Sequence, residues 1–205
     1  MSSFRISRSY QFTFVIFMTS LFLVLVQCRE KSKQKDLQIR GVIADSAMVV
    51  SARVEASRIG LDVLRNGGNA FDAMIATDLA LVVAYPFSGN IGGGGFTVFR
   101  THAGEIGSVD YREKAPLAAH RDMYLDENGE IIPGLSTLGA LAVGVPGTIA
   151  GLFESHSRFG TKPFSELIQP AIDLANHGVA VTKKQAARLN RYRKYFEQAN
   201  ERTIF

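Results

Sequence analysis

Four consecutive glycines at positions 92–95 restrict the fold of this chain more than any other feature of its sequence, and Gly89 precedes them closely. A glycine loses roughly 0.5–1 kcal/mol of ordering free energy relative to alanine, so four together cost about 2–4 kcal/mol unless the backbone requires them. The missing side chains must therefore permit a close approach, either to another backbone segment or to a ligand.

Two interpretations of Gly92, Gly93, Gly94 and Gly95 are open. A phosphate-binding loop needs a following Lys-Ser or Lys-Thr and a helix, but here the strand-like run FTVFR follows. The spacing of a dinucleotide-binding loop also fails. The pattern favours a tight crossover from helix to strand in which two backbones touch.

The rest of the chain predicts helices layered on a small amount of strand, an α/β (α+β) class without internal repeats. Asn69 and the pair Thr182 and Gln185 have the spacing of helix N-caps. Glycines or a proline follow most of the helices, as at helix ends, and Pro170 predicts a kink. The expected helices cover 54–66, 70–85, 146–159, 165–177 and 183 to about 200, with a strand at 47–53 and a hairpin formed by 96–100 and 106–111.

The positive charge of the chain belongs to its N-terminal end. The sequence has 23 Lys and Arg against 19 Asp and Glu, but from Leu37 onward the two classes are equal at 17 each. A neutral domain gives no support for nucleic-acid binding. The basic stretch 183–194 could contact nucleic acid or anionic lipid, but the pattern favours a solvated helix face.

An uncharged, apolar run at 12–26 follows Arg5 and Arg8, which is typical of an export signal. Residues 1–28 are predicted to be a cleaved signal peptide or an uncleaved signal anchor. Cys28, the only cysteine, could instead be lipidated, although Gln27 stands where a lipoprotein signal usually has a small residue. Residues 29–38 then form a solvated linker, and the exported domain at 39–205 is either membrane-anchored or periplasmic.

Arg112 is the main candidate for binding a ligand. It follows the hairpin in the segment DYREKAP, where a guanidinium can hold a carboxylate through two parallel hydrogen bonds. The residue types alone favour an ordinary ion pair with Asp110 or Glu113 over a ligand site.

Other chemistry-bearing residues form no recognisable site. Ser136, Ser155 and His156 lack the G-x-S-x-G turn of a serine nucleophile. The four histidines show no metal-ligand spacing, so no metal and no cofactor is expected.

Six motifs, in order, resemble the γ-glutamyltransferase (gamma-glutamyltranspeptidase, glutathione hydrolase) family over about residues 47–189. They are NGGNAFDAMIAT, GNIGGGGF, DYREKAP, RDMYLD, VGVPGTIAGL and PFSELIQPAIDLANHG. The resemblance implies an N-terminal-nucleophile (Ntn) hydrolase, an αββα sandwich formed when a precursor cleaves itself into a large and a small subunit. It also implies that Arg112 binds the α-carboxylate of a γ-glutamyl substrate such as glutathione.

In that family the nucleophile is a threonine at the start of the small subunit, and its freed amine can serve as the base. No such Thr-Thr-His motif occurs here; the nearest pair, Thr101-His102, falls at the hairpin tip. By resemblance, 39–205 is the N-terminal part of a large subunit, truncated, without catalytic residues and expected to be inactive alone. Alternatives are a non-catalytic membrane-tethered module, or a related cephalosporin acylase or poly-γ-glutamate capsule depolymerase.

Overall fold

The structure is a computed structural model that describes residues 41–89 and 91–199. The chain divides into two units, Met1–Ile43 and Ala44–Phe205, and every element named below belongs to the second. The predicted export signal, Cys28 and the predicted linker at 29–38 lie outside the described residues. Within the described ranges, no helix combines the length and the apolar character needed to cross a bilayer.

Helices cover one face of a β-hairpin, and most predicted elements are confirmed within two residues at each end. Two results differ from the sequence prediction. The expected strand at 47–53 is wrong, because that segment pairs with no described strand, and the helix expected from 146 begins at Thr148. The elements are α2 (Val54–Arg65), α3 (Ala70–Ala84), β1 (Phe96–Arg100), β2 (Ile106–Asp110), the 3-10 helix η1 (Ala140–Ala142), α4 (Thr148–Phe159), α5 (Phe164–His177) and α6 (Lys183–Ala199).

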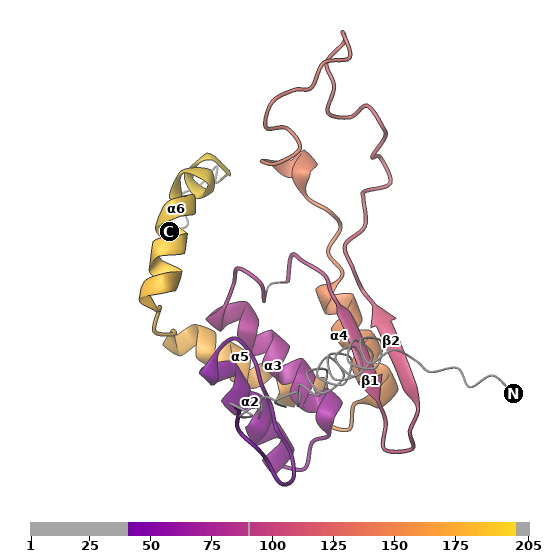
Figure 1. Ribbon diagram of the computed structural model, residues 1–205, viewed down its shortest axis with the longest axis vertical. Coiled ribbons are helices and arrows are strands. Elements are labelled where there is room, and N and C mark those ends of the chain that lie inside the picture. Colours follow the sequence, from indigo (N-terminus) through magenta and orange to yellow (C-terminus); the bar gives the residue numbers. More distant parts are fainter. Residues whose placement is uncertain (1–40, 90, 200–205) are drawn as a thin grey trace, which may run out of the picture. The chain divides into compact units, whose positions relative to one another are not determined.

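Helix α3 is the centre of the core, and it packs against α2, α4 and α5 (Figure 1). It is apolar on most faces and rich in alanine, which permits close approach on several sides. At its contact with α2, a Cβ atom on Gly60 would overlap the hydroxyl oxygen of Thr77. The buried core joins α3 to α4 and α5 through Ile75, Ala76, Leu79, Leu152, Leu167 and Ala171.

The N-terminus of α3 is held by a buried carboxylate. Asn69 is the N-cap, as predicted, and with Asp72 it forms a capping box. Asp72 also accepts hydrogen bonds from the Thr161 backbone N–H (3.0 Å) and hydroxyl (2.5 Å) and from the Lys162 N–H (3.4 Å). Burial by itself raises the pKa of Asp72, but these hydrogen bonds and that from the Asn69 N–H outweigh it and hold the pKa below its ordinary value of 3.8. Ionised Asp72 therefore joins α3 to the α4–α5 connection.

We expect Asp72→Asn to lower the free energy of unfolding at pH 7 by about 1–3 kcal/mol, because an amide cannot accept all of these hydrogen bonds. A carboxylate with a depressed pKa stabilises the fold above its unfolded pKa, and this contribution is lost as the pH falls through the folded pKa. The difference between wild type and Asp72→Asn should therefore shrink below about pH 4. Urea unfolding at several pH values measures this difference in the free energy of unfolding.

Asp62→Asn is the matched control, because Asp62 lies on the exposed surface of α2 and pairs only with exposed Arg65. Its effect should stay below about 0.5 kcal/mol. Equal stability of Asp72→Asn and wild type at pH 7 would contradict the role given to Asp72.

Ser155 on α4 is fully buried, and its hydroxyl has no hydrogen-bond partner among the described residues. A buried hydroxyl without a partner costs free energy, so Ser155→Ala should stabilise the domain by about 1 kcal/mol. Thermal unfolding can test this. Ser157→Ala is the control, since the exposed Ser157 hydroxyl bonds only its own helix, and a clear destabilisation by Ser155→Ala would disprove the expectation.

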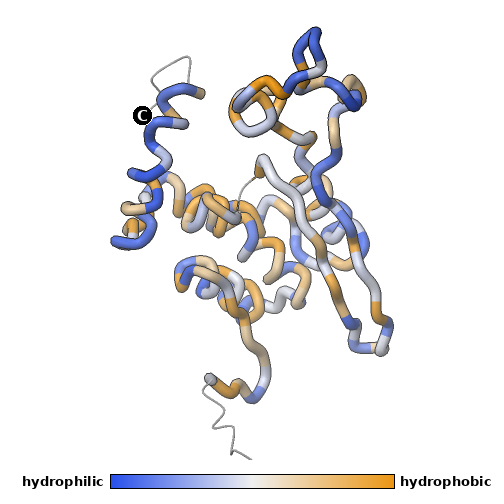
Figure 2. The backbone as a smooth tube through the Cα atoms, turned by 45° about the horizontal axis from the view of Figure 1, so that its top comes forward, coloured by the Kyte–Doolittle hydropathy of each residue, from blue (hydrophilic) through white to orange (hydrophobic). Residues whose placement is uncertain are grey.

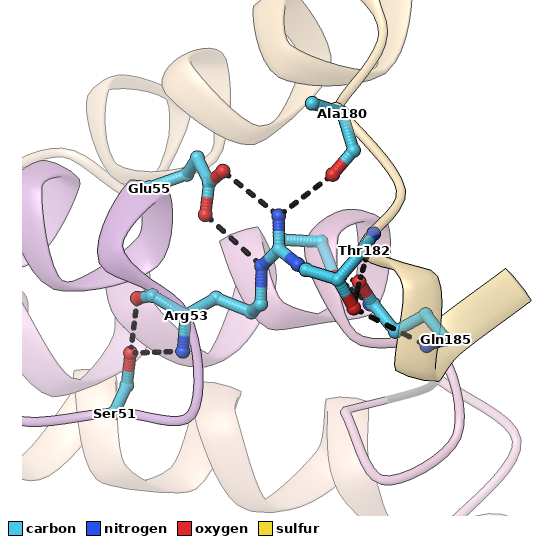
Figure 3. Close-up of polar contacts among 7 residues, drawn as sticks. Ser51, Arg53, Glu55, Ala180, Thr182 and Gln185 are labelled. Atoms are coloured by element: carbon cyan, nitrogen blue, oxygen red, sulfur yellow. Dashed lines mark hydrogen bonds and ion pairs between the residues drawn. The ribbon is translucent and has the colours of Figure 1, made fainter.

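Arg53 is only 9% exposed, and it connects the start of α2 to the start of α6 (Figure 3). Its guanidinium donates two hydrogen bonds to Glu55 (2.8 and 3.0 Å), one to the carbonyl of Ala180 (3.0 Å) and one to Gln185. Gln185 in turn donates to the carbonyl of Ala84 at the end of α3 (2.8 Å). The predicted cap between Thr182 and Gln185 is present, so this network fixes where α6 leaves the domain.

The β-hairpin is antiparallel, with Thr97 opposite Val109. Thr97 and Phe99 are buried on one face, and the Phe99 ring contacts those of Phe71 and Phe159 at centroid distances of 5.5 and 4.7 Å. The opposite face is exposed and apolar at Phe96, Val98 and Ile106.

Candidate functional site

The glycine run packs against the segment just after β2, which carries Arg112. A Cβ atom on Gly94 would lie 2.6 Å from both the Glu113 nitrogen and the Tyr111 oxygen, and one on Gly95 would lie 2.9 Å from the Tyr111 ring. The backbones of Gly95 and Tyr111 also exchange hydrogen bonds of 3.0 and 3.4 Å, which continue the hairpin ladder. At Gly94 and Gly95, therefore, the missing side chains allow a close contact with another segment of the same chain and not with a ligand.

The other three glycines of the predicted loop lie just upstream of this contact. Gly89 packs on the end of α3, where a Cβ atom would lie 2.5 Å from that of Leu81. Gly92 lies in the turn that leads to β1. The carbonyl of Gly93 accepts hydrogen bonds from the N–H groups of Gly147 (2.8 Å) and Thr148 (3.0 Å), and so caps the first turn of α4.

Helix α4 closes the other side of the same segment. A Cβ atom on Gly147 would overlap the carbonyl oxygen of Tyr111, and one on Gly151 would overlap its ring. Lys114 and Val145 form an isolated antiparallel bridge just beyond. Three of the sequence motifs, GNIGGGGF, DYREKAP and VGVPGTIAGL, therefore meet around Tyr111, whose hydroxyl lies 3.2 Å from that of Thr97.

Arg112 emerges from this packed junction and is exposed. Its backbone N–H donates to the Asp110 carboxylate at 3.0 Å. Among the described residues its guanidinium forms no ion pair with Asp110, Glu113 or any other acid. The ordinary ion pair that the residue types favoured is thus not formed.

Arg112 borders an open pocket of about 370 Å³. Lys114 contributes a second cation, Asp110 and Glu154 contribute acids, and Pro146, just before α4, and Ala150 in its first turn form the wall. A pocket with two cations and two acids can hold a small zwitterion such as an α-amino acid group, with the guanidinium on its carboxylate.

Asp78 is a candidate that sequence reasoning missed. Its carboxyl borders a second pocket, of about 490 Å³, between the segment at 48–51, α3 and β1, and burial raises its pKa. A usable signal was present, because Asp78 is the only charged residue between Asp72 and Arg100. Tyr111 borders both pockets.

The remaining candidates lie apart from these pockets. Thr101 forms the hairpin turn, where it accepts from Gly104 and Glu105, and the His156 ring bonds the Lys162 carbonyl (2.7 Å). In the part of the chain that the structure describes, no three His, Cys, Asp or Glu side chains are grouped closely enough to hold a metal ion.

Known proteins resemble this chain in both sequence and fold. The family model described as Gamma-glutamyltranspeptidase matches residues 56–205. The glutathione hydrolase proenzyme of Pseudomonas sp. (strain A14) is 48% identical over 164 residues, which cover 79% of this chain and 28% of that protein. This chain thus spans well under half the length of that relative.

Solved structures agree with the sequence match. Helicobacter pylori gamma-glutamyltranspeptidase superposes with a TM-score of 0.75 and 45% identity, over 78% of this chain and 46% of that one. Cephalosporin acylase from Bacillus halodurans superposes with a TM-score of 0.62 and 26% identity, over 82% of this chain and 32% of that one. The fold is the α/β fold of the Ntn hydrolases, and the chain belongs to the gamma-glutamyltranspeptidase family.

Proposed function

We propose that the protein containing this chain is a γ-glutamyltransferase and glutathione hydrolase. It transfers the γ-glutamyl group of glutathione to water or to an amino acid through an acyl-threonine intermediate. The threonine belongs to a segment beyond residue 205, so residues 1–205 alone are inactive. The reaction needs no metal or cofactor, because the nucleophile's own amine can act as the base.

The exposed guanidinium of Arg112 is the observation that carries this proposal. The guanidinium borders the pocket and forms no ion pair with a described acid. Three glycine-bearing segments hold the backbone of Arg112 in place. A cation positioned in this way is available for the α-carboxylate of a γ-glutamyl substrate and orients the γ-carbonyl for attack.

The exposed face of the hairpin supports a two-subunit precursor. Phe96, Val98 and Ile106 are 61–79% exposed and lie on one side of β1 and β2. A sheet buries its apolar face against another layer. We propose that the small subunit from the same precursor supplies this layer, and that it completes the αββα sandwich and brings the nucleophile towards Arg112.

We also propose that the domain is exported and stays at the membrane through its N-terminal segment, with residues 1–28 as a signal or anchor, Cys28 as an alternative lipid attachment point and 29–38 as linker. The uncharged run at 12–26 after two arginines supports this assignment.

An acylase acting on cephalosporin side chains is the second candidate, favoured by the superposition on the Bacillus halodurans enzyme. An acyl donor that keeps the carboxylate but lacks the α-amino group can separate the two candidates.

The test is expression of the complete reading frame that contains these residues. We expect the precursor to cleave itself and then to release p-nitroaniline from γ-glutamyl-p-nitroanilide, and residues 1–205 alone to release none. Glutaryl-p-nitroanilide, which lacks the α-amino group, is the matched control and should react far more slowly. Turnover of the glutaryl substrate alone would favour the acylase. A complete product that cleaves neither itself nor either substrate would favour a non-catalytic membrane-tethered module.

A further inference from the structure

Helix α6 is strongly basic, whereas the rest of the domain is net negative. From Leu37 onward the chain has 17 basic and 17 acidic residues, and α6 holds six of the basic and one of the acidic residues. The remainder therefore has eleven basic and sixteen acidic residues. Figure 2 shows α6 as hydrophilic along most of its length. All of its cationic residues are exposed, and none forms an ion pair with an acid in the described ranges.

A few residues on one side of α6 contact the rest of the domain, although no residue of the helix is buried. Gln185 bonds to Arg53 and Ala84, Leu189 borders a small apolar pocket next to Pro86, and Tyr192 lies 6.1 Å from Phe87 between ring centroids. With 3.6 residues per turn, these three α6 residues share one side of the helix.

The opposite side of α6 is cationic. On the same helical geometry, four cations fall within an arc about 100° wide that faces away from Gln185, Leu189 and Tyr192. The four are Lys183, Lys184, Arg191 and Lys194. All four side chains are exposed, so this basic face is turned to solvent.

We propose that the basic face of α6 docks on an anionic lipid surface. This inference rests on the proposed N-terminal membrane segment, which keeps the domain within reach: residues 29–53 span at most about 90 Å when fully extended. A Lys or Arg close to an anionic bilayer contributes about fivefold to binding. The net negative remainder of the domain is repelled by the same surface, so docking through α6 also orients the domain.

The test uses the full chain with Cys28→Ser and Ala187→Cys, because Ala187 is exposed in the middle of the basic arc. An environment-sensitive fluorophore on the new cysteine reports contact with lipid headgroups that carry a quencher. Vesicles consist of phosphatidylcholine alone or with added phosphatidylglycerol, and flotation measures insertion of the N-terminal segment separately.

We expect quenching on the vesicles that contain phosphatidylglycerol, little on phosphatidylcholine alone, and reversal in about 1 M salt, where the Debye length is about 3 Å. The triple variant Lys183→Gln, Lys184→Gln, Arg191→Gln should shift the ratio of docked to free α6 by about a hundredfold. The matched control neutralises the exposed Arg58, Arg100 and Arg121 and should dock like wild type. Circular dichroism confirms that both variants fold.

Equal quenching on both kinds of vesicle, or an unchanged triple variant, would overturn the proposal. So would binding of a DNA duplex without any response to phosphatidylglycerol, which would assign the face to nucleic acid. If the protein does not float with the vesicles, only the proposal that the N-terminal segment inserts into the membrane is contradicted. The docking of α6 is then still tested by quenching on the anionic vesicles.

Discussion

Arg112→Ala in the complete precursor should raise KM for γ-glutamyl-p-nitroanilide about ten- to a hundredfold. A charge-assisted hydrogen bond to a carboxylate is worth roughly 1.5–3 kcal/mol, and this range corresponds to that loss of affinity. The substitution should leave folding intact, because the guanidinium is exposed and forms no ion pair with a described residue. Steady-state kinetics and a thermal melt of the same preparation measure both quantities.

Two further variants make this result specific. Arg112→Lys keeps the charge but loses the two-pronged geometry, so its KM should fall between those of wild type and Arg112→Ala. Arg121→Ala removes an arginine that is 94% exposed and pairs only with Asp122, and it should leave KM unchanged. If Arg112→Ala keeps the wild-type KM, the guanidinium does not bind the substrate carboxylate.

Gly147→Ala should destabilise the domain by about 3 kcal/mol or more, because the new methyl group would overlap the carbonyl oxygen of Tyr111. Neither the Tyr111 backbone nor the first turn of α4 can move freely, since the N–H of Gly147 is bonded to Gly93. The φ of Gly147 is −114°, so the cost is one of space and not of backbone conformation. Denaturant unfolding measures it.

Gly129→Ala provides the comparison. Gly129 has open space around its Cβ position but a φ of +82°, so alanine there should cost only about 1 kcal/mol of backbone strain. In the complete enzyme, Gly147→Ala should also lower γ-glutamyl hydrolysis, because the segment that it displaces carries Arg112. Equal stability of Gly147→Ala and Gly129→Ala would show that the junction is not tightly packed.

Residues near one another in the chain were enough to predict most of the secondary structure. The cap at Asn69 needs only Asp72 three residues later, and the cap at Thr182 needs only Gln185. A positive φ at Gly67 and at Gly178 ends α2 and α5 at the predicted places. The strand expected at 47–53 was wrong because a strand depends on a pairing partner, and local composition cannot supply one.

At the candidate site, too, local sequence predicted some features and only the packing of distant segments decided the others. Its motifs could be recognised along the chain, since each consists of adjacent residues, and the glycine run by itself required a close approach of the backbone. Local sequence could not say what approaches. Tyr111 fits between Gly95 and Gly151, which are 56 positions apart, and the Arg112 guanidinium forms no ion pair with Asp110 or Glu113. Such contacts form only when distant segments pack, so the folded chain alone decided that Arg112 faces a pocket.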